Sequence, residues 1–563
     1  MTYDVLIIGG GPAGSSVGAL LRRYNPSLKV LIIERERFPR DHVGESQLPA
    51  ICSVLNEMGA WDKVEAAGFP IKVGSTYRWG RTDDLWQVNF LQEDIEDRPR
   101  PGQYRGQRAR TAFQVDRSIY DKILLEHAQS MGCEVIQNAK VTEILRDGDC
   151  ITGVKTAPSD PTDVQAGESV PELLTARYYV DASGGSGILR RAMDVQIESP
   201  STLRNIALYD YWQDAEWAET IGKHGTRAQI MSIGWGWLWF IQITQTRTSI
   251  GLVTPAEYYK SCGKKPEDLY MEAVSIEPRI SKLVQSARCE HKFHATKDWN
   301  YLTDRLAGDN WFLVGDACGF ADPILTAGMT LAQVSARKVA YTIIELDRKE
   351  VDEAWLKTEY TRTHRSNIYQ HIRFAEYWYS ANGCFTDLQD NCRQIAADAG
   401  LDLSPDAAFR WLGTGGFASD VLASEDANIF GLRMAKVIAG RFGGAPAGWE
   451  VVKKNKFQMN LAGTTRDTMA IYLDGRVNAV NCLRRGNKAL PLVGNNQMIY
   501  SILKFESDAT TVGQLMANHI SKNPGLFPEP QRAFDKGLEV LETMIVDGWV
   551  TASINKKRPF LDI

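Results

Sequence analysis

The first residues that could bind a ligand form a glycine-rich turn near the start of the chain. This segment contains Gly9, Gly11, Pro12, Ala13 and Gly14. The spacing Gly-x-Gly-x-x-Gly allows a tight turn and lets the backbone approach a pyrophosphate, which the free N–H groups of a following helix then bind. Glu34 lies 20 residues after Gly14 and could accept hydrogen bonds from ribose hydroxyls. These residues predict a site for a dinucleotide.

Two later segments distinguish FAD from NAD. Residues 178–187 read as an apolar strand that ends in Asp181, and residues 312–317 as a strand that ends in Gly315-Asp316. Both resemble the second and third flavin motifs of the p-hydroxybenzoate-hydroxylase-like flavoproteins, and they occur in that group's order. The resemblance implies FAD, with Gly315-Asp316 at the ribityl chain and pyrophosphate and Arg117, in the segment 114–117, as a flavin-side contact.

Two further segments resemble the flavin-dependent halogenases. Residues 234–253 resemble that family's Trp-x-Trp-x-Ile-Pro signature, with Trp237, Trp239 and Ile241 aligned and Gln242 in the place of proline. Residues 68–80 resemble the segment that carries the family's catalytic lysine, which implies that Lys72 is that lysine. Val43-Gly44-Glu45-Ser46 matches a Gly-Glu-Ser loop, and the resemblance covers roughly residues 1–400.

The resemblance also implies a reaction, a halide and a partner. Reduced FAD, O₂ and chloride or bromide would give hypohalous acid, and the lysine would hold or react with it and pass halogen to an electron-rich aromatic ring. An amine suits either role, because it offers three donors when protonated and a nucleophilic lone pair when not. Since no second dinucleotide fingerprint occurs, a separate flavin reductase is expected to supply FADH2.

The segment 322–331 resembles the family's Asp-Pro-x-x-Ser-Ser/Thr-Gly loop at the start of a helix. Pro323 and Gly328 are expected to contact the flavin, and the backbone N–H groups of Ala327 and Gly328 to hold the halide. Tryptophan halogenases carry a glutamate two residues after the proline, and Leu325 stands there. The chain therefore resembles the phenol or pyrrole group more closely, whose substrates are free or bound to a carrier protein. Asp322 is the candidate for the covalent FAD linkage of some relatives.

Other functions share part of this pattern. A single-component FAD aromatic monooxygenase has the same flavin motifs, and Gln242 keeps that alternative open, whereas Lys72 and the tryptophan pair argue against it. A geranylgeranyl-reductase-like flavoenzyme predicts a wide apolar pocket. A flavin-binding scaffold without activity is the non-enzymatic alternative. The tryptophans could also be plain core residues, since Trp235, Trp237 and Trp239 alternate and are expected on one face of a sheet.

The elements that must position these residues indicate an α/β fold. Val5–Ile8, Gly14–Tyr24 and Val30–Glu34 read as strand, helix and strand, which predicts a Rossmann-like FAD-binding domain with a parallel sheet. Residues 228–253 predict an inserted antiparallel sheet, as in the p-hydroxybenzoate-hydroxylase-like fold. We expect a core over 1–355, a mainly helical region over 356–490, and a small winged-helix-like subdomain over 491–563.

Composition sets the broad class. The chain has 563 residues and a formal net charge of −5 from 64 basic and 69 acidic residues, which suggests neither a nucleic-acid partner nor an anionic membrane. Its nine cysteines include no Cys-x-x-Cys pair, and no metal site is expected. No apolar run reaches the roughly 18–20 residues of a membrane span, and no signal peptide is recognisable. A cytoplasmic enzyme is the expectation.

Overall fold

The computed structural model describes most of the chain. The described residues are 2–79, 84–90, 108, 111–163, 170–222, 224–297, 300–380, 449–486, 488–527 and 529–561. They form two compact units, one with the residues up to 375 together with Asp474–Val477, the other with the described residues from 376 onward apart from that turn. The division into three parts at residues 355 and 490 stays a prediction.

A parallel sheet in the first unit carries the glycine turn. Its parallel strands are β6 (Glu134–Ile136), β2 (Val30–Ile33), β1 (Thr2–Ile8), β9 (Leu173–Asp181) and β18 (Trp311–Leu313), in that order. Ile8 is in register with Ile33 and with Asp181, and Leu313 is in register with Asp181. The carboxyl ends of these four neighbouring strands therefore meet at one edge, where ligands of such sheets bind. The predicted strand, helix and strand at the N-terminus are confirmed.

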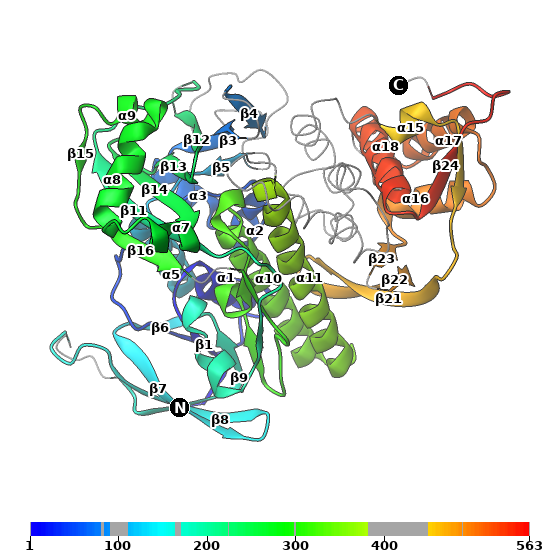
Figure 1. The fold of residues 1–563 in the computed structure, drawn as a ribbon. Coiled ribbons are helices and arrows are strands. Elements are labelled where there is room, and N and C mark those ends of the chain that lie inside the picture. The colour runs from blue at the N-terminus through cyan, green and yellow to red at the C-terminus, as the bar shows by residue number, and fades with distance from the viewer. Residues whose placement is uncertain are drawn as a thin grey trace. The chain divides into compact units, whose positions relative to one another are not determined.

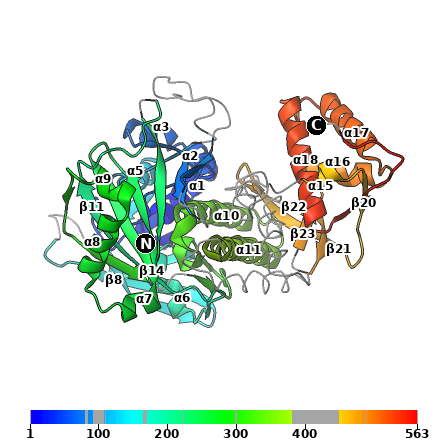
Figure 2. The ribbon, with the colours of Figure 1, turned by 45° about the horizontal axis from the view of Figure 1, so that its top comes forward.

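Helices cover this sheet, and an antiparallel extension continues it. Helix α1 (Pro12–Tyr24) packs against α5 (Arg117–Ser130) and against α10 (Gly328–Arg348). Helix α11 (Glu353–Ser380) lies beside α10 in both views (Figures 1 and 2). Strands β7 (Ala139–Asp147) and β8 (Cys150–Pro158) pair antiparallel with each other, and β8 pairs with β9.

A second, nine-stranded sheet is inserted into the same unit. Its path is β15 (Arg288–Cys289), β11 (Asn205–Gln213), β14 (Arg247–Pro255), β13 (Gly236–Gln242), β12 (Gly225–Ile233), β3 (Ile71–Arg78) and β4 (Trp86–Asn89), with β16 (His294–Lys297) beside β11 and β5 (Ala112–Phe113) beside β3. All pairs are antiparallel except β3 with β12. Helices α7 (Ala256–Ser261), α8 (Pro266–Ile276) and α9 (Pro278–Leu283) cover one face, where Leu238 and Phe240 of β13 join the apolar core (Figures 1 and 2). The other face therefore remains for the site.

Shorter elements complete the first unit. They are α2 (Ile51–Met58), α3 (Trp61–Ala66), α6 (Ile188–Ala192), β10 (Ile197–Glu198), β17 (Tyr301–Thr303), β19 (Gly319–Phe320) and the 3₁₀ turns η1 (Gly184–Ser186), η2 (Gly315–Ala317) and η3 (Pro323–Leu325). In the described parts of the chain, no helix is both long and apolar enough to cross a membrane.

The second unit combines helices with strands. Its elements are α15 (Glu450–Lys453), β20 (Lys456–Met459), β21 (Thr465–Leu473), β22 (Arg476–Arg485), β23 (Lys488–Pro491), α16 (Gly494–Leu503), α17 (Ala509–Lys522), α18 (Pro530–Val546) and β24 (Val550–Ser553). Four strands thus lie where we expected mainly helices. Asp474 and Gly475 connect β21 to β22 with φ of 49° and 73°, and an Asp-Gly pair of this kind is a hairpin signal that the sequence already contained.

Candidate functional site

The glycine turn has the geometry that its spacing predicts. Gly9 has a φ of 110°, and a Cβ at Gly14 would lie 1.9 Å from the Gly9 carbonyl oxygen. Gly11 differs, because among the described residues a Cβ there would meet only the Arg40 guanidinium, at 3.5 Å, and this glycine caps α1 without a side chain. Gly9 and Gly14 are therefore required by the protein's own packing, whereas Gly11 leaves room for a ligand at the helix N-terminus.

Glu34, directly after β2, hydrogen-bonds to this turn. Its carboxylate is 5% exposed, and Oε2 accepts a hydrogen bond from the Gly10 N–H at 2.7 Å. Oε1 accepts from the Glu36 N–H at 2.9 Å. The contact of Glu34 with a ribose stays a prediction.

Asp181 holds the neighbouring loop rather than pointing into open space. One carboxylate oxygen accepts from the Ser183 hydroxyl at 2.6 Å, and the other from the N–H of Leu189 at 2.8 Å. Burial raises the pKa of this carboxyl, and these hydrogen bonds lower it. Both oxygens are used by the chain, so Asp181 shapes the loop that lies against Gly9.

The Gly315-Asp316 turn follows β18 beside the first turn of α1. Gly315 has a φ of 59°, and a Cβ there would lie 3.3 Å from Ala13. Burial raises the pKa of Asp316 to about 6, and the charge of Arg117 lowers it. The backbone carbonyl of Asp316 accepts a hydrogen bond from Tyr301. The structure thus brings the three predicted flavin segments to one sheet edge.

Arg117 begins α5 and joins that helix to the segment 41–46. Its guanidinium donates to both oxygens of Asp121 at 2.7 and 2.9 Å and to the Val43 carbonyl at 2.9 Å. It also lowers the pKa of His42 to about 4, because two positive charges would otherwise lie side by side. Arg117 therefore fixes the segment in which Glu45 is buried.

Lys72 is fully buried in β3, although lysine is ordinarily exposed. Its ammonium donates to the Gln47 carbonyl at 3.0 Å and to the Thr326 hydroxyl at 3.2 Å, and it lies 5.6 Å from the centroid of the Phe90 ring. Burial lowers the pKa of the amine to about 7. The side chain thus reaches the 322–328 loop with an amine that changes charge near neutral pH.

A bulge in β3 turns Lys72 toward that loop. The pairing of β3 with β12 shifts register, because Lys72 opposes Thr226 while Gly74 opposes the next residue, Arg227. Arg78 forms an ion pair with Glu277 on the face covered by helices. In a regular strand Lys72 would share the face of Arg78, since residues an even number apart point the same way. One extra residue places it on the opposite face.

The 322–328 loop leads into the long helix α10. Asp322 accepts a hydrogen bond from the Ile324 N–H at 2.9 Å and so caps η3, which begins at Pro323. Thr326 has a φ of 53°. Ala327 is the N-cap of α10, and a Cβ at Gly328 would lie 3.0 Å from Phe320. The first N–H groups of this helix form a potential anion site beside the Lys72 amine.

The tryptophan pair lies on the face of the inserted sheet opposite to α7, α8 and α9. Trp237 and Trp239 are 1% and 6% exposed, and Ile241 is also buried. The Trp239 indole donates to the Ser249 hydroxyl at 3.1 Å and covers Gly251, where a Cβ would be 2.1 Å from the ring. The glycine therefore makes room for the indole.

The prediction that Trp235 shares this face was wrong. Trp235 stacks on Tyr258 of α7 at 5.0 Å and packs against the core under the helices. The reason is that β13 begins at Gly236, and the preceding turn breaks the alternation. Gln242, at the proline position of the signature, is buried and accepts from the Thr226 hydroxyl at 3.2 Å.

Other side chains at this site were not predicted from the sequence. Tyr209 stacks on His294 with ring centroids 4.9 Å apart and lies 6.1 Å from Trp239, which extends the aromatic face. Arg190 is buried over the Tyr301 ring, and its Nε and Nη1 lack a hydrogen-bond partner among the described residues. These residues carry no recognisable motif, and only the fold brings them to the site.

The donor set at the sheet edge fits FAD. A pyrophosphate needs N–H groups and positive charge. The turn at Gly11, the guanidinium of Arg40 and the two nitrogens of Arg190 that have no partner in the described part of the chain offer both. Gly315 keeps the adjacent backbone close to α1. The predicted residues and the two arginines together can therefore hold the nucleotide.

Comparison with known proteins gives consistent results. Residues 2–375 match the FAD binding domain family. The chain is 30% identical over 396 residues to the 1H-pyrrole-2-carbonyl-(peptidyl-carrier protein) chlorinase of Pseudomonas fluorescens, covering 68% of this chain and 85% of the relative. It is 30% identical over 383 residues to the tryptophan 2-halogenase of Chondromyces crocatus, covering 67% and 68% of the two chains.

Solved structures share the fold. The crystal structure of CmlS, a flavin-dependent halogenase, matches with a TM-score of 0.72 at 23% identity, covering 100% of this chain and 98% of the other. The myxobacterial chondrochloren halogenase CndH matches with a TM-score of 0.60 at 25% identity, covering 79% of this chain and 97% of the other.

Proposed function

Because this chain belongs to the flavin-dependent halogenases within the FAD binding domain family, we propose that Lys72 transfers halogen to a phenolic or pyrrolic ring. The relatives include both a pyrrole-type and a tryptophan-type enzyme, so similarity alone does not select the substrate. Leu325, in the place of the tryptophan enzymes' glutamate, favours a ring that is electron-rich enough to react without that carboxylate.

The observation that carries this proposal is the burial of Lys72 beside the 322–328 loop. Its amine is 0% exposed and lies 3.2 Å from the Thr326 hydroxyl. With a pKa of about 7, the amine is present in both charge states at neutral pH. The ammonium form can donate a hydrogen bond to hypohalous acid, and the neutral form can accept the halogen.

The other residues divide the remaining tasks. When bound and reduced, FAD supplies with O₂ the oxidising power that converts halide into hypohalous acid. The glycine turn holds the nucleotide end of FAD, Arg117 contacts the flavin side, and the N–H groups of Ala327 and Gly328 hold chloride or bromide. Trp237 and Trp239 close the aromatic face and limit the access of water. A separate flavin reductase supplies the reduced cofactor.

The test is a mass measurement on lysine variants. Wild type, Lys72→Ala and Lys72→Arg are incubated with FAD, a flavin reductase, NADH, bromide and a panel of phenols and pyrroles. We expect a halogen isotope pattern from wild type and a loss of about 10²–10⁴-fold in both variants, since guanidinium is a poor nucleophile. FAD binding should persist in both.

Two outcomes would contradict the proposal. If Lys72→Ala keeps more than about a tenth of the halogenation, a loss below ~1.4 kcal/mol, Lys72 does not act on the halogen. A product that gains one oxygen without the reductase would favour the monooxygenase alternative.

A further inference from the structure

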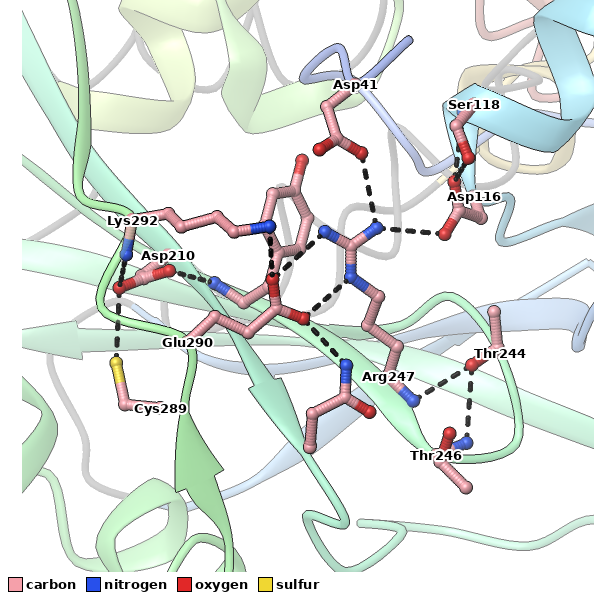
Figure 3. A network of polar contacts seen from close by, with 12 residues as sticks. Asp41, Asp116, Ser118, Asp210, Thr244, Thr246, Arg247, Cys289, Glu290 and Lys292 are labelled. Carbon is pink, nitrogen blue, oxygen red and sulfur yellow. Dashed lines mark hydrogen bonds and ion pairs between the residues drawn. The ribbon is translucent and has the colours of Figure 1, made fainter. Parts of the chain in front are cut away.

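Arg247, the first residue of β14, joins four separate segments through its guanidinium (Figure 3). Nη1 donates to Asp116 at 3.0 Å and lies 3.4 Å from Asp41. Nε and Nη2 lie 3.1 and 3.4 Å from the two carboxylate oxygens of Glu290. The side chain is 13% exposed, so its pairs with Asp116 and Glu290 are largely shielded from water, whereas Asp41 is 47% exposed. Because its hydrogen bonds lie in one plane, a guanidinium of this kind fixes the direction of its partners as well as their distance.

The same guanidinium rests on Tyr211 of β11. Its carbon lies 3.9 Å from the ring centroid, and the Tyr211 hydroxyl donates to Glu45 at 3.0 Å. Glu45 is 2% exposed, and burial raises the pKa of its carboxyl. Two neighbouring side chains of the inserted sheet, Arg247 and Tyr211, thus reach toward the flavin-binding part of the unit.

The contact of Arg247 with Asp116 and the contact of Tyr211 with Glu45 both lie next to Arg117. Asp116 divides its carboxylate, since Oδ1 accepts from the Ser118 N–H at 2.9 Å and caps α5, while Oδ2 accepts from Arg247. The next residue, Arg117, donates to the Gly44 carbonyl at 3.2 Å, adjacent to Glu45. Arg247 and Tyr211 therefore hold the two segments that Arg117 connects.

The charges make Arg247 difficult to replace. It faces three carboxylates, of which Asp116 and Glu290 are only 8% and 11% exposed. Lys292 also lies 3.5 Å from Glu290, but its side chain is 60% exposed. A lysine at position 247 would keep one charge but could neither contact three acids at once nor stack on Tyr211, because its ammonium is compact.

We propose that Arg247 is a positioning residue for halogen transfer. It holds the flavin-side segments 41–46 and 116–117 at a defined distance from the sheet face that carries Trp239, so that oxidised halogen forms within reach of the substrate. Arg247 contacts neither substrate nor reacting atoms, and it acts through Asp116 and Tyr211. This inference rests on the proposed function.

The test compares Arg247→Lys with a matched control, Arg227→Lys. Arg227 is 12% exposed and pairs with Glu219 at 2.6 Å in the same sheet. For each variant, FAD affinity is measured by fluorescence titration of the apo-protein, and coupling is measured as halogenated product per O₂ consumed when FADH2 is fully enzyme-bound. A general loss of folded protein lowers the product and the O₂ consumed by the enzyme together, so it leaves this ratio unchanged.

We expect Arg247→Lys to lower the coupling ratio and to weaken FAD binding, each by about 3–10-fold, as the net loss of one ordinary hydrogen bond does, since lysine keeps the charge. Arg227→Lys should change both by less than about twofold, because its partner Glu219 lies outside the segments 41–46 and 116–117. The double variant Arg247→Lys with Asp116→Asn should couple no worse than Arg247→Lys alone, since the two residues act as one link.

If Arg247→Lys and Arg227→Lys have the same FAD affinity and the same coupling ratio, the inference is wrong. If Arg247→Lys does not fold, Asp116→Asn, which retains the Oδ1 cap of α5, gives the same comparison. A wild-type protein and control that bind FAD yet halogenate nothing would contradict the proposed function instead, and the affinity difference would then decide the role of Arg247 alone.

Discussion

The variant Lys72→Met should show what the buried amine contributes to the free energy of unfolding, because methionine replaces it with an uncharged side chain. Burial lowers the pKa of this amine from 10.5 to about 7, whereas an unfolded chain keeps the ordinary value. Between these pH values the unfolded state binds more protons than the folded state. The free energy of unfolding of the wild type therefore rises with pH across this window, and it is lowest below pH 7.

The size of the effect follows from the shift. The burial of an ammonium with a pKa of about 7 lowers stability by about 5 kcal/mol at pH 6 and by about 2 kcal/mol at pH 9. Methionine has no such penalty, but it leaves the Gln47 carbonyl and the Thr326 hydroxyl without their donor. That loss is about 1–3 kcal/mol at every pH. The free energy of unfolding of Lys72→Met minus that of wild type should thus decrease by about 3 kcal/mol from pH 6 to pH 9.

Urea unfolding of the apo-proteins at several pH values measures this difference. Lys63→Met, at an exposed lysine of α3, is the control and should show no such trend. If the difference in unfolding free energy between Lys72→Met and wild type is the same at pH 6 and pH 9 to within about 0.5 kcal/mol, the Lys72 amine is not buried in the folded protein.

Other predictions concern the turn, the aromatic face and the pH dependence. Gly11→Leu should weaken FAD binding about tenfold or more without lowering the apo-protein's Tm, because only the ligand needs that space; unchanged affinity in a fluorescence titration would contradict this. Gly14→Ala should destabilise the apo-protein in urea unfolding by about 1–3 kcal/mol, because its Cβ would overlap a backbone oxygen of the turn. Gly251→Ala should displace Trp239 and lower kcat/KM by about tenfold while FAD affinity stays unchanged; unchanged steady-state kinetics would argue against the role of that indole. The pH profile of kcat/KM should inflect near the pKa of Lys72, about 7, and a flat profile from about pH 6 to pH 8 would exclude its titration from the reaction.

The parts of this protein whose causes are local follow from short stretches of the amino-acid sequence. The turn at Gly9 and Gly14 needs glycine because of its own backbone, and the strand before it and the helix after it follow from short-range patterns. The resemblance to halogenases likewise rests on contiguous segments around Lys72 and Trp237. The Asp474-Gly475 hairpin was also local, and the signal was present although the prediction favoured helices.

The contacts between groups far apart in the chain depend on the complete fold. The Lys72 amine and the Thr326 hydroxyl are 254 positions apart, and their contact depends on a bulge in β3. Gly74 is a general sign of a bulge or of a close backbone approach, but only the pairing with β12 shows where the register shifts. The stack of Arg247 on Tyr211 and the pairing of its guanidinium with Asp116 arise in the same way. Burial, and with it the lowered pKa of Lys72, is a property of everything packed around a side chain. The spacing of residues along the chain does not contain it.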